Sequence, residues 1–145
     1  MLMDRDAIAA MLPHAGAMCL LDGLLAWDRG SISCVSRRYL ARDNPLRRAD
    51  GTLGIAAGIE IAAQAMALHG GLIAAAGGKP THGVLASVRD VRFAAAKLDA
   101  AAGEVAVDAE LLAGDAGGAT YRFALTRNGR VLLSGRATVI LETTA

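Results

Sequence analysis

Glu60 and Gln64 are the residues whose types and spacing best support chemistry. They lie in segment 54–77, where His69 is the only other strongly polar side chain. Residues four apart lie on one face of a helix, so the carboxylate and the amide are expected to be neighbours. A carboxylate near the start of a buried helix must be hydrogen-bonded, neutralised or used in a reaction. The pair therefore predicts either a catalytic acid or base, or a carboxylate that only stabilises the fold.

The three histidines are less well placed for chemistry. His69 lies two and a half helical turns after Glu60, so we expect it on the opposite face of the helix, in a structural role. His14 follows Pro13 in a predicted turn, and His82 lies at the start of a predicted strand. We keep His14 and His82 as secondary catalytic candidates. No pair has the spacing of metal ligands, so we predict no metal site.

Segment 54–77 is expected to form the long helix that carries Glu60. It contains no proline and is rich in Ala, Ile, Leu and Met, which favour a helix or tolerate it when buried. Its apolar residues run almost all the way round, so the helix must be enclosed by protein or by lipid. The segment is long enough to span a membrane, but the cost of inserting a central carboxylate disfavours that alternative. We therefore predict no membrane insertion.

The remaining pattern predicts strands and short turns around this helix. The expected strands are segments 18–27, 31–40, 83–93, 104–112, 119–127 and 131–142. A short helix is expected over residues 4–12, capped by Asp4 and ended by Pro13. Asn128-Gly129 is the strongest turn signal, because both central residues of that hairpin turn need a positive φ. The order predicts an α+β hotdog fold in a single domain, residues 1–145, with a long central helix wrapped by a curved antiparallel sheet of about five or six strands.

The composition fits a core of small aliphatic side chains. Hydrophobic residues make up 54% of the 145 residues and aromatic residues only 3%. The net charge is +1 and the basic residues are scattered, so nothing indicates a nucleic-acid surface. Cys19 and Cys34 are too few for a disulfide scaffold, and the charged N-terminus is not that of a signal peptide. We therefore expect a cytoplasmic protein, and the apolar excess indicates an oligomer.

Four motifs give the chain a resemblance to a known family. Residues 12–14 (LPH) and 18–22 (MCLLD) resemble the opening of the 3-hydroxyacyl-[acyl-carrier-protein] dehydratases, and residues 58–65 (GIEIAAQA) resemble their central helix. Residues 83–93 (GVLASVRDVRF) and 102–104 (AGE) resemble the strand and the turn that follow. The motifs keep the family's order over nearly the whole chain. The resemblance is strongest to the hotdog dehydratase-like proteins of aryl polyene and related pigment pathways.

The resemblance implies a reaction and a set of site residues. The substrate would be a 3-hydroxyacyl thioester on the phosphopantetheine of an acyl carrier protein, in fatty acid or polyene synthesis, with no further cofactor. Glu60 and Gln64 match the carboxylate and the glutamine of the family's helix. Gly58 and Ile59 match the positions whose N–H groups bind the thioester carbonyl. Family members complete their sites across a subunit interface, so a homodimer or a hetero-oligomer with another hotdog protein is expected.

One family residue is missing. The catalytic histidine is expected about fourteen residues before Glu60, where this chain has Leu46, and segment 41–53 contains no histidine. Asn44 is the nearest polar candidate. Two alternatives to a dehydratase therefore stay open. One is a hotdog acyl thioesterase that uses Asn44 with Glu60, and the other is a non-catalytic subunit that pairs with a histidine-bearing paralogue.

Overall fold

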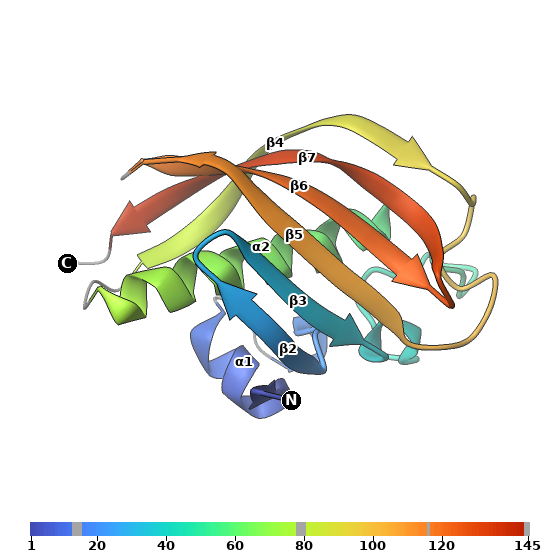
Figure 1. Cartoon of the computed structure of the whole chain (residues 1–145). Coiled ribbons are helices and arrows are strands. Elements are labelled where there is room, and N and C mark those ends of the chain that lie inside the picture. Colours follow the sequence, from blue (N-terminus) through green and yellow to red (C-terminus); the bar gives the residue numbers. More distant parts are fainter. Residues whose placement is uncertain (13–15, 78–80, 116, 144–145) are drawn as a thin grey trace.

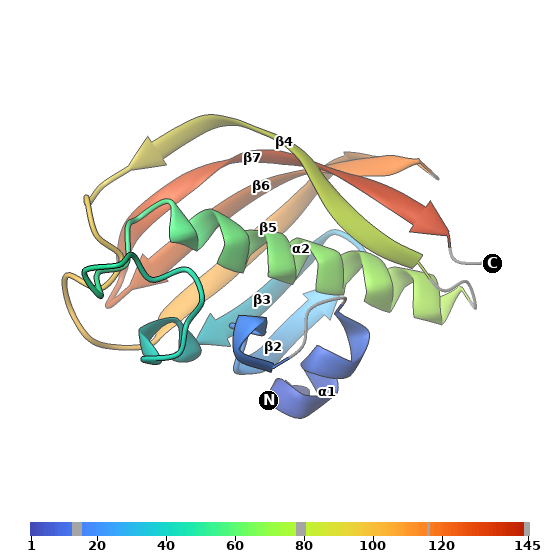
Figure 2. The ribbon, with the colours of Figure 1, turned by 180° about the vertical axis from the view of Figure 1, so that it is seen from behind.

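The fold is a curved antiparallel sheet around one long helix. The computed structural model describes residues 1–12, 16–77, 81–115 and 117–143. The 20-residue helix α2 (Ala57–Ala76) lies across the concave face of a seven-stranded sheet (Figures 1 and 2). The strands are β1 (Met3–Asp4), β2 (Gly23–Asp28), β3 (Ser31–Ser36), β4 (Thr81–Phe93), β5 (Val105–Gly114), β6 (Gly118–Arg127) and β7 (Arg130–Thr143). Their order across the sheet is β1-β2-β3-β5-β6-β7-β4.

The sheet has slightly more strands than the sequence predicted. The additional strand is the two-residue β1, which pairs with the start of β2 and is too short to show an alternating pattern. The strand expected over residues 18–27 begins only at Gly23, because residues 16–18 form a 3₁₀ turn, η1 (Gly16–Met18). The strand expected over residues 31–40 ends at Ser36, where the chain enters a second 3₁₀ turn, η2 (Arg38–Leu40).

Asp22 explains why β3 ends at Ser36 and does not continue to residue 40. Its carboxylate accepts hydrogen bonds from the backbone N–H groups of Arg37 and Arg38, the latter at 2.8 Å. A carboxylate that accepts from the first N–H groups of a helical turn caps that turn and stabilises it. The chain therefore turns into η2 instead of continuing along the sheet.

Two local signals in the sequence are confirmed. The Asp4 side chain accepts a hydrogen bond from the Ala7 N–H at 2.9 Å and caps helix α1 (Arg5–Met11). Asn128 and Gly129 have φ angles of 51° and 78°, and they join β6 to β7 in a tight hairpin. Only a residue that tolerates positive φ fits each of these two positions, which is why the Asn-Gly pair was informative.

The core lies between α2 and the concave face of the sheet. α2 contacts β3, β4, β5, β6 and β7, and α1 packs beside it. By length and composition α2 could also cross a membrane, but here it is the central helix of the fold. Cys19 and Cys34 are both buried and free in this core. Burial raises the pKa of the Cys34 thiol to about 12.

Gly58 brings the first turn of α2 close to the sheet. A Cβ at this position would overlap the end of the Leu133 side chain on β7 and lie 3.1 Å from Leu125 Cδ2 on β6. Glycine at this position therefore lets the first turn of α2 lie directly on two strands. Gly71, later in the same helix, differs because its Cβ would meet only Met11 Cε, at 3.4 Å.

We predict opposite effects for alanine at these two glycines. Both substitutions improve the helix propensity of α2, by up to about 1 kcal/mol. Gly71→Ala is therefore expected to leave the free energy of unfolding unchanged or raise it. Gly58→Ala is expected to lower it relative to Gly71→Ala by about 1–3 kcal/mol, because the added methyl overpacks the core. Urea denaturation of both variants measures the difference, and equal stabilities would show that Leu133 moves aside without cost.

Candidate active site

Glu60 lies in the first turn of α2 and is half-buried. The sequence predicted deeper burial, and that prediction is wrong in this chain for a geometric reason. Ala56, Glu60, Ala63 and Ala67 lie on one side of the helix, and all four stay partly or fully exposed. We call these residues the α2 stripe. Ile61, Gln64 and Ala65, on the other sides of the same turns, are buried, so the carboxylate stands at the border between core and solvent.

Gln64 fixes the carboxylate in place. Its side chain is only 2% exposed, and its Nε2 donates to Glu60 Oε1 at 3.3 Å and to the Met18 carbonyl at 2.7 Å. Its Oε1 accepts from the Leu20 N–H at 2.9 Å. The predicted Glu60–Gln64 contact is therefore confirmed. The glutamine also hydrogen-bonds the segment before β2, so the position of the Glu60 carboxylate is fixed relative to that segment as well as to α2.

The backbone at the start of α2 forms tight turns. The N–H groups of Ala57, Gly58 and Ile59 donate to the carbonyls three residues earlier, at 3.0–3.1 Å. We expected the N–H groups of Gly58 and Ile59 to bind a thioester carbonyl, but both are engaged in these turns. The contribution that remains at this end of the helix is the partial positive charge of the dipole, which lies close to Glu60.

Asn44 is held inside its own loop. It is 3% exposed, its Nδ2 donates to the Tyr39 carbonyl at 2.9 Å, and its Oδ1 accepts from the Leu46 N–H at 3.0 Å. Both ends of the amide therefore stabilise the loop that leads into α2. The structure gives no contact between Asn44 and Glu60, and a catalytic role for Asn44 stays a prediction.

The two histidines that the structure describes lie far from Glu60 along α2. His69 is nine residues further along the helix, a rise of about 14 Å. β4, which carries His82, begins at Thr81, and Figures 1 and 2 place the start of this strand beside the C-terminal end of α2, the end remote from Glu60. His14 lies outside the described residues. Within the described part of the chain, no histidine is placed to share a substrate atom with Glu60.

His69 has the structural role that the sequence predicted. It is fully buried, with Nε2 2.7 Å from the Asp28 carbonyl and Nδ1 2.6 Å from the Tyr121 hydroxyl. A carbonyl can only accept, so Nε2 carries the proton and Nδ1 accepts from the Tyr121 O–H. Burial lowers the pKa of His69 below its usual value of 6.5. The neutral ring therefore joins the β2–β3 turn, α2 and β6.

Buried Arg127 and half-buried Arg47 organise the loops around the start of α2. Arg127 donates from Nη1 to the Tyr39 hydroxyl at 3.1 Å and to the Leu98 carbonyl at 2.8 Å. Arg47 donates to the Leu40, Ala41 and Gly51 carbonyls and pairs with Asp99 at 3.2 Å. The sequence did not predict either role, because the partners of Arg47 in its loop and of Arg127 at the end of β6 follow from no local pattern.

The described residues contain no group of three His, Cys, Asp or Glu side chains that could hold a metal ion. One long helix wrapped by a curved antiparallel sheet places the chain in the hotdog class of folds. Within that class, the chain belongs to the ApeP-like family of ApeP dehydratases, whose sequence profile matches residues 6–144. No curated protein sequence matches the chain.

Solved structures confirm the hotdog fold. A chain of the dehydratase heterocomplex ApeI:P from Xenorhabdus doucetiae is similar over 93% of this chain and 90% of its own, with 23% identity and a TM-score of 0.83. A thioesterase from Haemophilus influenzae is similar over 99% of this chain and 93% of its own, with 12% identity and a TM-score of 0.67. A mutant thioesterase from Pseudomonas aeruginosa covers 99% and 97%, with 14% identity and a TM-score of 0.69. At these identities the similarity shows the fold alone.

The lowered pKa of His69 predicts a pH-dependent stability. In the unfolded chain the imidazole of His69 is protonated below about pH 6.5. In the folded chain it is protonated only below its lowered pKa. The free energy of unfolding should therefore fall as the pH drops from about 6.5, by about 1.4 kcal/mol per unit of pKa difference. Urea denaturation at pH 7.5 and pH 5.5 measures this loss. In His69→Gln the loss should be smaller, and an equal loss in both proteins would contradict the assignment.

Proposed function

We propose that the chain is a dehydratase subunit that acts on a 3-hydroxyacyl thioester carried by the phosphopantetheine of an acyl carrier protein. The pathway would be fatty acid or polyene synthesis in the cytoplasm, with no further cofactor. The observation that carries this proposal is the carboxylate of Glu60, held by Gln64 at the start of the central helix. Membership of the ApeP-like dehydratase family supports the same reaction.

The proposed chemistry needs an acid and a base on the two sides of the substrate. A base removes the proton from C2, and the acid protonates the hydroxyl that leaves C3 as water. We assign the acid to Glu60, whose side chain is fixed by Gln64 and borders solvent, where an acyl chain can reach it. The positive end of the α2 dipole would stabilise the negative charge that develops on the thioester carbonyl.

We propose that the base comes from a second hotdog protein. The described histidines of this chain lie too far from Glu60, and two surfaces of the chain fit a partner. β4 is a 13-residue edge strand that pairs only with β7 among the described residues, and it exposes Val84 and Phe93 by 47% and 51%. The α2 stripe is small and mostly apolar. A sheet edge and an apolar helix side both favour association.

The structural neighbour supports a hetero-oligomer over a homodimer. That neighbour is named as a chain of a dehydratase heterocomplex. A partner that carries the missing histidine would complete a site to which this chain contributes Glu60. A homodimer would contain two copies of Glu60 and, at the family's histidine position, two copies of Leu46.

A thioesterase is the weaker candidate. It would require the Asn44 amide to bind the substrate or a water molecule beside Glu60. That amide already bonds the Tyr39 carbonyl and the Leu46 N–H, and freeing it would cost about 1–3 kcal/mol for each buried group left without a partner. The dehydratase therefore requires less rearrangement of the structure.

Glu60→Gln is expected to remove activity and keep the fold. The new amide can still accept the hydrogen bond from Gln64, so the free energy of unfolding should change by less than about 0.5 kcal/mol. Loss of the acid should lower kcat for dehydration about 10²–10⁴-fold. Enoyl thioester formation is measured by mass spectrometry of the carrier protein. Glu104→Gln, which removes an exposed carboxylate elsewhere, is the matched control and should retain full activity.

The purified chain alone is expected to dehydrate the substrate slowly. Addition of a histidine-bearing hotdog partner should raise the rate about 10²–10⁴-fold, the contribution of one positioned general base.

Full activity without a partner would contradict the hetero-oligomer, and His14 and His82 would then be the first residues to substitute. Release of free acid instead of the enoyl product would identify a thioesterase. Wild-type rates from a complex that contains Glu60→Gln would identify this chain as a non-catalytic subunit.

A further inference from the structure

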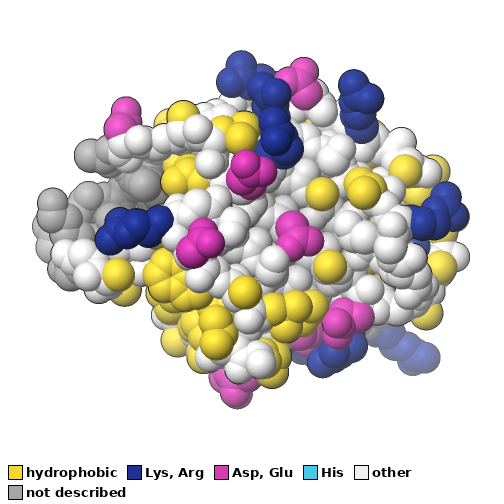
Figure 3. Space-filling model, in the orientation of Figure 1, with side chains coloured by type: hydrophobic (Ala, Val, Ile, Leu, Met, Phe, Trp, Pro, Cys, Tyr) yellow, Lys and Arg dark blue, Asp and Glu magenta, His cyan; other side chains and the backbone are white. Residues whose placement is uncertain are grey.

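Four arginines share the outer face of the sheet, the side away from α2. Arg89, Arg92, Arg122 and Arg136 are all exposed, and we call them the arginine patch. In the strand register Arg89 on β4 lies opposite Arg136 on β7, and Arg136 lies opposite Arg122 on β6. Three like charges therefore stand side by side across three neighbouring strands. Figure 3 shows Lys and Arg side chains, with acidic side chains beside them, along the upper margin, where Figure 1 places β4 and β7.

A bulge in β4 brings the fourth arginine to this face. Arg89 and Arg92 are three residues apart, so in a regular strand they would point to opposite faces. The register shifts between them, and they lie opposite Arg136 and Ser134, which are two residues apart on β7. The inserted Asp90 has a φ of 55°, in the left-handed region. Both arginines consequently point outward.

The other inserted residue, Val91, stays on the inner face. Its Cγ2 lies 3.2 Å from where a Cβ of the buried Gly135 would stand. The bulge thus moves a second cation to the outer surface, while Val91 stays half-buried beside Gly135. Its effect is to enlarge the arginine patch.

This arrangement costs stability within the chain. Like charges directly opposite each other on neighbouring strands are destabilising. The nearest acidic groups compensate little, because Asp90 is 4.0 Å from Arg136 and Glu110 is 3.8 Å from Arg122, all well exposed. Protection of a sheet edge by charge explains arginines on β4, but Arg122 and Arg136 lie on interior strands. A binding partner of opposite charge explains all four.

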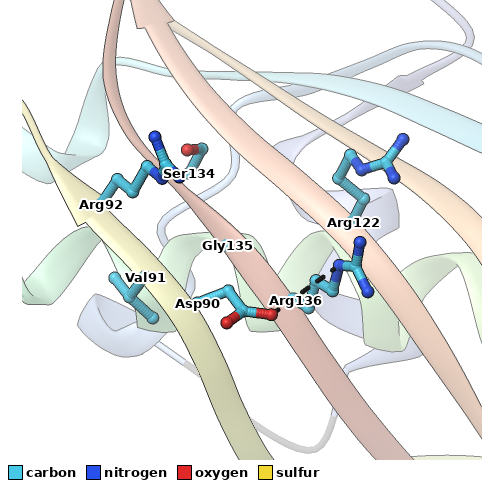
Figure 4. A pocket seen from close by; sticks show the side chains of 7 residues that line it. All are labelled: Asp90, Val91, Arg92, Arg122, Ser134, Gly135 and Arg136. Atoms are coloured by element: carbon cyan, nitrogen blue, oxygen red, sulfur yellow. Dashed lines mark ion pairs between the residues drawn. The ribbon is translucent and has the colours of Figure 1, made fainter.

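Three arginines of the patch, Arg92, Arg122 and Arg136, line an open hollow of about 390 Å³. It is lined by Asp90, Val91, Arg92, Arg122, Ser134, Gly135 and Arg136, and Figure 4 shows the side chains of Arg122 and Arg136 on the same side of it. Guanidinium groups bind carboxylates with two parallel hydrogen bonds, so this hollow suits acidic side chains of a protein surface. The whole chain has a net charge of only +1, so this local excess is not a general basicity of the chain.

The arginine patch also lies near the candidate active site. Arg92 precedes Phe93, the last residue of β4, which pairs with Leu133 on β7. Leu133 in turn packs against Gly58, two residues before Glu60. The patch and the carboxylate therefore lie on opposite faces of the same corner of the sheet. A flexible arm could pass the end of β4 from one to the other.

We propose that the arginine patch docks the acidic surface of the carrier protein that presents the thioester. The inference rests on the proposed function, because only a tethered substrate requires its carrier to touch this chain. The patch would steer the carrier electrostatically, and the carrier's arm would deliver the acyl chain around the end of β4 to Glu60.

Charge reversal tests the docking surface. The chain, assembled with its hotdog partner where one is needed, is titrated with a holo-acyl carrier protein by calorimetry. The double variant Arg122→Glu/Arg136→Glu is expected to weaken binding at least about tenfold at low ionic strength, and less at high salt, where charges are screened. Asp90→Asn should strengthen binding. Arg29→Glu reverses an exposed arginine in the β2–β3 turn and should leave Kd unchanged.

Turnover separates this inference from the proposed function. The double variant should raise KM for the carrier-bound substrate and leave turnover of a carrier-free 3-hydroxyacyl thioester unchanged. Wild-type affinity of the double variant, or an equal loss in Arg29→Glu, would overturn the docking surface. Carrier binding that depends on the patch, without dehydration of either substrate, would support the surface and refute the dehydratase. If the double variant fails to fold, Arg122→Gln/Arg136→Gln makes the same comparison.

Discussion

The buried amide of Gln64 is the interaction on which the site depends. It bonds two backbone groups of the segment that enters β2 and one carboxylate oxygen on its own helix. A buried amide with three partners is stable, whereas one with any partner missing would be costly. The position of Glu60 is therefore linked to the packing of residues 18–20, which lie at least forty positions earlier in the chain. A change in the packing of residues 18–20 would therefore also move the Glu60 carboxylate.

The sequence predicted the elements better than the contacts between them. The long helix, the β6–β7 hairpin and the Asp4 cap follow from local patterns, and all three are present in the structure. The partners of Gln64 and of His69 come from distant segments, and no local pattern identifies them. The burial of Glu60 was overpredicted because alanine counts as apolar wherever it lies. The alanines of the α2 stripe stay partly or fully exposed in the single chain, so the apolar helix is not enclosed on every side.

For the reaction that we propose, the polar groups of this chain form one half of a site. One side of the proposed reaction, a carboxylate with a fixed orientation, is present in this chain, and the described histidines are either used in the core or remote from it. The family relationship and the open edge of β4 indicate where the other half would be supplied. A chain of this kind can lose one catalytic residue without loss of the reaction, provided that its partner retains it.

The two buried thiols, Cys19 and Cys34, can serve as probes of local and global unfolding. Cys19 lies beside Leu20, in the segment that Gln64 holds, whereas Cys34 lies on β3 in the middle of the sheet. A thiol reacts only as an exposed thiolate, so alkylation of either one requires the surrounding structure to open. The rate at Cys19 would report local detachment of the segment next to Glu60, and the rate at Cys34 would report unfolding of the sheet. The same molecule thus records the mobility of its site and the stability of its scaffold separately.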